Sequence, residues 1–125
     1  AKIAGGLHHT VKPNRDEAGT FLILTAMVGG RVEVKGVNPQ HMESLIEKLK
    51  AAGVKIGVSQ DSVVLEMSVR PVGVDIVACP YPGFPTDLQP QWSALAVISQ
   101  GSAKIVDTVY SSRFDHMYEL EKATC

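Results

Sequence analysis

The chain has 125 residues, 45% of them hydrophobic and 20% charged, a composition typical of a globular domain and not of a disordered segment. Its 12 Lys and Arg residues and 13 Asp and Glu residues give a formal net charge of -1, which favours neither a nucleic acid nor a membrane as partner. The longest apolar run, residues 21–28, is too short for a bilayer, which needs roughly 20 residues. Because Cys79 and Cys125 form no CxxC pair and no secretory signal is evident, we expect a cytoplasmic protein.

Residues 10–69 have the pattern of one complete structural unit, which follows a loose segment over residues 1–9. Gly29 and Gly30 are typical of a helix end, and Asn38-Pro39 is typical of a helix start. Strict alternation over residues 31–35 indicates a half-buried strand. The expected order is β-α-β-α-β-β, with a strand at 10–12, a helix at 16–28, a strand at 31–35, a helix from 39 to 53, and strands at 54–58 and 62–67.

The same pattern begins again at residue 74, which indicates an internal repeat of about 70 to 75 residues. The expected elements are a strand at 74–78, a rigid loop at 80–85, a helix at 86–99 capped by Thr86, a strand at 103–109 and a final helix. Setting Gly30 on Gly101 places Phe21 on Trp92, so Trp92 is expected in the core. The first helix is expected to carry its apolar residues at helical spacing, namely Phe21, Leu22, Leu24, Thr25 and Val28.

The second unit, residues 70–125, ends within a helix and lacks the closing strand pair of the first. A half-built unit leaves an apolar face and a sheet edge uncovered. We therefore expect the chain to be one piece of a larger protein, completed by the remainder of that protein or by a second copy.

Two segments carry a resemblance to a known family. The stretch PYPGFPTDLQPQ at residues 80–91, followed by SRFDHMYEL at 112–120, resembles UDP-N-acetylglucosamine 1-carboxyvinyltransferases, which open peptidoglycan synthesis. Residues 15–20, 41–53 and 107–109 agree with it, and the resemblance runs from residue 10 to residue 120. It implies an α/β fold of repeated βαβαββ units in an inside-out barrel, of which this chain supplies well under half.

The resemblance also implies a reaction and its residues. The family transfers the enolpyruvyl group of phosphoenolpyruvate to the 3-hydroxyl of UDP-N-acetylglucosamine, with release of phosphate and without a metal or other cofactor. Asp87 matches the aspartate beside the sugar hydroxyl, Val109 a residue that contacts the UDP-sugar, and Arg113 an arginine near the reacting groups. Nothing here matches the family's loop with the proton-donating Cys, so the isolated chain is expected to be inactive.

Each of these residues also has a plain structural interpretation. Asp87 stands at a helix start, where a carboxylate is stabilised without any catalytic role, as Asp16 would be in the first unit. Arg113 suits a phosphate or carboxylate but could equally form a surface ion pair. His116 is expected at a helix start and Gly19 at a site of close packing.

Two alternatives of other kinds stay open at this point. One is a non-catalytic scaffold module of the same fold that pairs through its unfinished sheet. The other is a 3-phosphoshikimate 1-carboxyvinyltransferase, which has the same architecture. The PGFPTDLQ segment argues against the second alternative.

Overall fold

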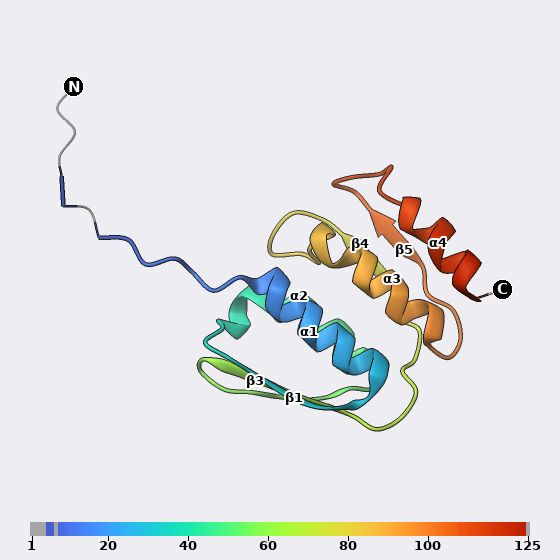
Figure 1. The fold of residues 1–125 in the computed structure, drawn as a ribbon, viewed down its shortest axis with the longest axis horizontal. Coiled ribbons are helices and arrows are strands. Elements are labelled where there is room, and N and C mark those ends of the chain that lie inside the picture. The colour runs from blue at the N-terminus through green and yellow to red at the C-terminus, as the bar shows by residue number, and fades with distance from the viewer. Residues whose placement is uncertain (1–4, 7, 125) are drawn as a thin grey trace.

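The structure is a computed structural model that describes residues 5–6 and 8–124. Its first half contains two layers, helices on one side and a sheet on the other (Figure 1). The elements are α1 (Arg15–Val28), β1 (Gly30–Lys35), the 3-10 helix η1 (Pro39–Met42), α2 (Glu43–Ala51), β2 (Lys55–Val58) and β3 (Ser62–Met67). The three strands form an antiparallel sheet in the order β1-β3-β2, with Val32 opposite Leu65 and Ile56 opposite the same leucine.

The second half contains a parallel strand pair and its helices. Its elements are β4 (Ile76–Ala78), the 3-10 helix η2 (Thr86–Leu88), α3 (Gln89–Ile98), β5 (Ile105–Asp107) and α4 (Asp115–Thr124). The α3 helix connects the parallel strands β4 and β5, and it packs beside α1 (Figure 1). Both strands are shorter than the sequence pattern indicated, and the helix expected at 86–99 is divided into η2 and α3.

The strand expected at residues 10–12 is wrong. These residues form no strand, and Val11 is 82% exposed on a segment that runs away from the sheet (Figure 1). A strand exists only where a second strand pairs with it, and within the described residues β1 pairs with β3 alone. The sequence of residues 10–12 is compatible with a strand, but no strand of the described residues pairs with it.

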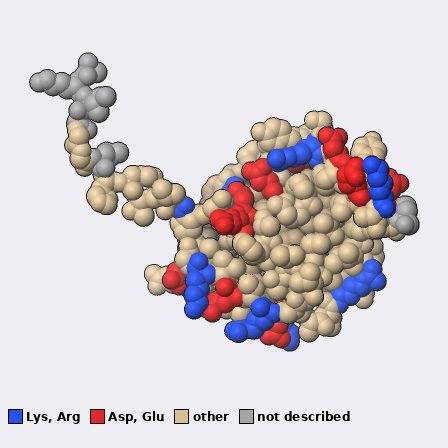
Figure 2. Space-filling view, in the orientation of Figure 1, with Lys and Arg blue, Asp and Glu red and all other residues tan. Residues whose placement is uncertain are grey.

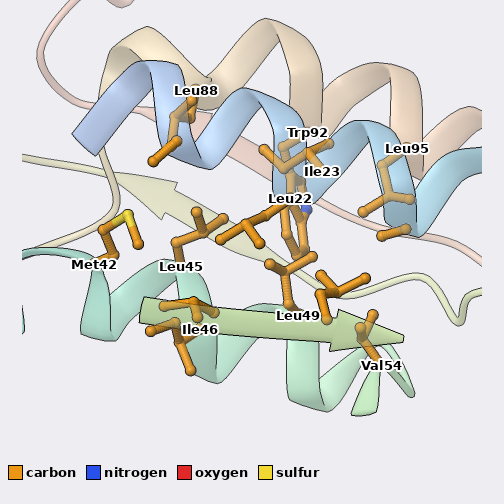
Figure 3. Packing of buried hydrophobic residues seen from close by; sticks show 14 of the residues in the cluster. Leu22, Ile23, Met42, Leu45, Ile46, Leu49, Val54, Leu88, Trp92 and Leu95 are labelled. Carbon is orange, nitrogen blue, oxygen red and sulfur yellow. The ribbon is translucent and has the colours of Figure 1, made fainter. Parts of the chain in front are cut away.

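One hydrophobic core joins the two halves. In Figure 3, Leu22 and Ile23 of α1 point toward Leu45 and Leu49 of α2 and toward Trp92 of α3. Trp92 is only 1% exposed, and its indole Nε1 donates a hydrogen bond of 3.2 Å to the carbonyl oxygen of Val74, while its ring meets Phe84 edge to face. The predicted burial of Trp92 is confirmed.

The equivalence of Phe21 with Trp92 is wrong. Phe21 is 52% exposed whereas Trp92 is 1% exposed, so the two residues do not occupy equivalent places in the core. Three members of the expected apolar face lie at the surface instead, namely Phe21, Leu24 and Val28.

The face on which α1 and α3 run carries few charged side chains at its centre (Figure 2). Figure 2 shows Lys, Arg, Asp and Glu side chains around the rim of the face on which α1 and α3 run in Figure 1, with few of them at its centre. Within the described part of the chain, no helix has both the length and the apolar character that a membrane crossing requires.

Candidate functional site

Asp87 and Arg113 meet at the surface although 26 positions separate them in the chain. Asp87 lies in η2, which follows the Pro-rich loop, and Arg113 lies in the segment between β5 and α4. Arg113 Nη1 donates a hydrogen bond of 2.9 Å to Asp87 Oδ1, and a second contact of 3.4 Å joins the same nitrogen to the carbonyl oxygen of Thr86. Two of the three residues predicted from the sequence are therefore in direct contact.

Both side chains of this ion pair are open to solvent. The Arg113 side chain is 42% exposed and that of Asp87 is 60% exposed, so a ligand can reach both. The hydrogen bond that Arg113 donates to Asp87, together with the charges of the nearby carboxylates, raises the pKa of Arg113 and keeps the guanidinium charged, although partial burial opposes this. The guanidinium also lies over the Tyr110 ring, 5.4 Å from its centroid, which fixes its direction.

Val109, the third predicted residue, stands at the start of the same loop. Its side chain is 40% exposed, and its backbone N–H donates a hydrogen bond of 2.9 Å to Asp107 Oδ1. Val109 is thus placed by its backbone, and its apolar side chain is left free to contact a ligand.

Asp107 is a residue of this region whose role the sequence did not indicate. It ends β5 and is only 5% exposed. Its Oδ2 accepts a hydrogen bond of 2.6 Å from Thr86 Oγ1, and its Oδ1 accepts from the backbone N–H groups of Val109 and Tyr110. Burial acts to raise the pKa of Asp107, but these hydrogen bonds and the charge of Arg113 outweigh it and lower the pKa below its ordinary value of 3.8.

Thr86 does not cap the helix as expected. Pro85 is the N-cap of η2 and makes no side-chain cap bond, whereas the Thr86 hydroxyl is directed to Asp107. This contact joins residues 21 positions apart, so no local sequence pattern indicates it.

His116 lies beside the site without joining it. It is the second residue of α4, as expected for a helix start, and its Nε2 lies 3.2 Å from Ser93 Oγ of α3. Burial, followed by the positive charge of Arg113, lowers the pKa of His116 from 6.5, while Asp115 opposes the shift. His116 therefore links α4 to α3 in its neutral form.

No metal site is formed by the part of the chain described here, because no three His, Cys, Asp or Glu side chains gather closely enough to hold an ion. The arrangement instead combines an exposed carboxylate, which can accept a proton from a hydroxyl group, with a guanidinium, which can bind a phosphate or carboxylate in bidentate fashion.

Comparison with known proteins decides the family. The sequence model of the EPSP synthase (3-phosphoshikimate 1-carboxyvinyltransferase) family matches residues 1–124. The chain belongs to this family. Its curated relatives, however, are named for the acceptor UDP-N-acetylglucosamine and not for 3-phosphoshikimate. The resemblance expected from residues 80–91 and 112–120 is confirmed.

Three relatives named UDP-N-acetylglucosamine 1-carboxyvinyltransferase illustrate the match. The protein of Halorhodospira halophila is 44% identical over 117 residues, which are 94% of this chain and 28% of the relative. That of Glaesserella parasuis is 41% identical over 93% of this chain and 28% of the relative, and the second such protein of Bacillus anthracis is 44% identical over 94% and 27%. The chain thus spans about 28% of the length of these relatives.

A solved structure shows the fold of this family. The enolpyruvyl transferase NikO from Streptomyces tendae superimposes with a TM-score of 0.76 over 90% of this chain and 27% of that chain, at 23% sequence identity. The fold is therefore α/β, as expected from the sequence, and is similar to part of the fold of an enolpyruvyl transferase.

Proposed function

We propose that this chain is part of a UDP-N-acetylglucosamine 1-carboxyvinyltransferase, in which it supplies Asp87, Val109 and Arg113 to the site of the sugar nucleotide. The observation that carries the proposal is the identity of 44% over 94% of the chain with proteins of that name. The contact of 2.9 Å between Asp87 and Arg113 supports it, because the two residues that the resemblance assigns to one site are adjacent.

In this function Asp87 acts on the 3-hydroxyl of the sugar. Its carboxylate accepts the hydroxyl proton as the sugar oxygen bonds to C2 of phosphoenolpyruvate, and C3 gains a proton from an acid outside these residues. In the second step C3 loses a proton, the C2–C3 double bond returns and the bond to phosphate breaks, which releases phosphate. The exposed Asp87, held by Arg113, contributes mainly through its position.

Arg113 and Val109 have binding roles in this function. The guanidinium presents several N–H donors, of which one is engaged by Asp87, and the remainder suit a phosphate or carboxylate oxygen. Val109 places an apolar side chain beside them for the nucleotide sugar. No cofactor is required for this chemistry.

The larger setting follows from the same proposal. Residues 10–69 and 70–125 are then successive α/β units of an inside-out barrel, the first without the strand expected at residues 10–12 and the second continued by chain outside the present sequence. The reaction belongs to peptidoglycan synthesis in the cytoplasm, and the partners of the chain are its two substrates and the remainder of the enzyme.

The experiment that tests the proposal is an amide NMR titration of the 125-residue chain. UDP-N-acetylglucosamine is expected to shift the resonances of residues 86–88 and 107–113, whereas 3-phosphoshikimate, the acceptor of the sister enzyme, is expected to leave them in place. Shifts with 3-phosphoshikimate alone would favour 3-phosphoshikimate 1-carboxyvinyltransferase activity. This second candidate is considered because the matching family model carries that name. A folded chain that responds to neither ligand would contradict the proposal and favour a scaffold.

A pair of variants makes this titration specific. Asp87→Ala removes a hydrogen-bond acceptor with a charge, a contact that contributes about 1.5–3 kcal/mol, so the Kd for UDP-N-acetylglucosamine should rise roughly tenfold or more. Asp61→Ala removes another exposed carboxylate, from the turn between β2 and β3, and should leave the Kd unchanged. No turnover is expected from the chain alone, because the proton-donating acid lies outside it. Phosphate release by the isolated chain would contradict this assignment.

A further inference from the structure

The carboxylate of Asp107 lies between the two segments that carry the candidate site. On one side its Oδ2 accepts a hydrogen bond of 2.6 Å from the hydroxyl group of Thr86, and Thr86 directly precedes Asp87. On the other side it accepts the N–H groups of Val109, at 2.9 Å, and of Tyr110, at 2.8 Å. All three contacts are made by one side chain that is 5% exposed.

The loop that reaches Arg113 is continuous with these contacts. The backbone N–H of Arg113 donates to the carbonyl oxygen of Tyr110 at 3.0 Å, and Tyr110 also lies under the guanidinium. A side chain that fixes the Tyr110 amide therefore fixes the turn from which Arg113 extends. The η2 helix and the loop are joined at two places, inside at Asp107 and outside at the ion pair.

The inner contact is the stronger of the two. An exposed ion pair such as that of Asp87 and Arg113 contributes little to holding two segments together. A buried carboxylate that accepts three hydrogen bonds is among the stronger polar contacts in proteins, because each bond is assisted by the charge. The spacing of Asp87 from Arg113 is therefore set chiefly by Asp107.

We propose that Asp107 is a positioning residue of the sugar-nucleotide site, which holds Asp87, through Thr86, at a fixed place relative to Val109 and Arg113. This inference rests on the proposed function, since it takes those three residues as the site. Asp107 does not touch the substrate, because it is buried and both of its oxygens are already engaged.

The lowered pKa of Asp107 agrees with this role. The same hydrogen bonds that position the two segments keep the carboxylate ionised through the neutral range, so it neither takes nor gives a proton during a reaction near pH 7. Its effect on Asp87 and Arg113 passes through geometry and through its charge.

The first test needs no ligand. Thr86→Val keeps the shape of the side chain and removes the hydroxyl, and Thr86→Ser keeps the hydroxyl. We expect Thr86→Val to raise the carboxyl pKa of Asp107 toward 3.8 and to shift the amides of residues 109–113 and the Nε resonance of Arg113. Thr86→Ser should leave the pKa of Asp107 and these resonances as they are in the wild type. Unchanged Asp107 titration and an unchanged 109–113 loop in Thr86→Val would overturn the proposal.

A matched control comes from α1. The Thr25 hydroxyl likewise donates a hydrogen bond, here of 2.9 Å to the carbonyl oxygen of Phe21, but Thr25 lies outside the site. Thr25→Val should leave the resonances of residues 87 and 107–113 in place. If Thr86→Val does not fold, Asp107→Asn makes the same comparison from the other side, and its effect must reach the Asp87 and Leu88 amides. An effect confined to residues 106–111 would overturn the proposal.

The second test uses UDP-N-acetylglucosamine. Loss of the contact in Thr86→Val should weaken binding by roughly tenfold, with Thr86→Ser close to the wild type. The double variant Thr86→Val/Asp107→Asn should bind no more weakly than Asp107→Asn, since both changes break one contact. If the wild-type chain binds no UDP-N-acetylglucosamine but the ligand-free test succeeds, the proposed function fails while the coupling by Asp107 stands.

Discussion

Replacing Gly19 with Ala tests how tightly α1 packs against the element that carries Asp87. Gly19 lies in the second turn of α1, where a Cβ atom would stand 2.5 Å from Leu88 Cδ1 and 3.0 Å from Leu45 Cδ2. Leu88 directly follows Asp87 and is 1% exposed, so its side chain has no solvent into which it can turn. The added methyl group must therefore move η2 or the helix itself.

Two opposing effects set the size of the change. Ala is favoured over Gly within a helix by about 0.8–1 kcal/mol. Overpacking in a filled core costs about 1–3 kcal/mol, and two leucine side chains are crowded here. We expect the cost to win, so that Gly19→Ala lowers the free energy of unfolding by about 1 kcal/mol.

Urea unfolding followed by the fluorescence of Trp92 measures this change directly, because Trp92 is the single tryptophan and is 1% exposed. Gly57→Ala is the matched control. A Cβ atom at Gly57 in β2 meets no atom within 4 Å, and this substitution should stabilise the chain by about 0.5–1 kcal/mol.

A pairwise change separates crowding from other causes. Leu88→Val shortens the crowded side chain, so Gly19→Ala should cost less in its presence than alone. A Gly19→Ala variant that gains as much stability as Gly57→Ala would refute the close approach of Leu88 to α1. An equal cost of Gly19→Ala in the wild-type chain and in the Leu88→Val variant would place the strain elsewhere.

Three further predictions follow from named contacts. Asn14→Ala should lower the free energy of unfolding by about 1 kcal/mol in urea, because Asn14 Oδ1 caps α1 through the N–H groups of Asp16 and Glu17; Asn14→Asp should retain the cap. The pKa of His116 is lower in the folded chain than in the unfolded chain. As the pH falls below 6.5, the unfolded chain therefore binds more protons and the free energy of unfolding decreases, whereas above pH 6.5 His116 does not affect it. His116→Gln should remove this dependence in unfolding curves measured between about pH 5 and 7, and an unaltered slope would contradict the assignment. Arg113→Lys should change stability by less than about 1 kcal/mol, yet it should weaken UDP-N-acetylglucosamine binding in the NMR titration, since Lys cannot reproduce the guanidinium fork.

The helix ends could be predicted because they depend on neighbouring residues. Gly29 has a positive φ of 78° and ends α1, and Asn38 accepts a hydrogen bond from the Gln40 N–H at the start of η1. Both signals act within a few positions of the chain. The strand predicted by alternation at residues 31–35 is confirmed, and so is the strand expected at residues 62–67, with which it pairs.

The buried face of α1 could not be chosen from its sequence. Apolar residues occur around most of this helix, so helical spacing alone fits either Phe21 and Leu24 or Leu22 and Ile23. Packing against α3 and the sheet decides in favour of the second pair. The internal repeat carried the same ambiguity, because it set the exposed Phe21 on the buried Trp92.

The candidate site was predicted in part, and only through family resemblance. Asp87 and Arg113 were named from their segments, and their contact depends on a tertiary arrangement that no local pattern contains. Asp107 was missed because its role depends on Thr86, 21 positions away. A buried carboxylate at a strand end has no sequence signature until its donors are known.

The pairing of β4 with β5 also determines when such a site can exist during folding. The two strands share three residue pairs, Ile76 with Ile105 through Ala78 with Asp107; Val109 and Arg113 follow β5, and Asp87 follows β4 after the loop of residues 79–85. A parallel pair needs its crossover helix in place before it forms, and contacts distant in sequence form slowly. We therefore expect hydrogen exchange to show the site as a late and easily opened unit. Brief separation of three residue pairs would then abolish ligand recognition while the antiparallel sheet persists.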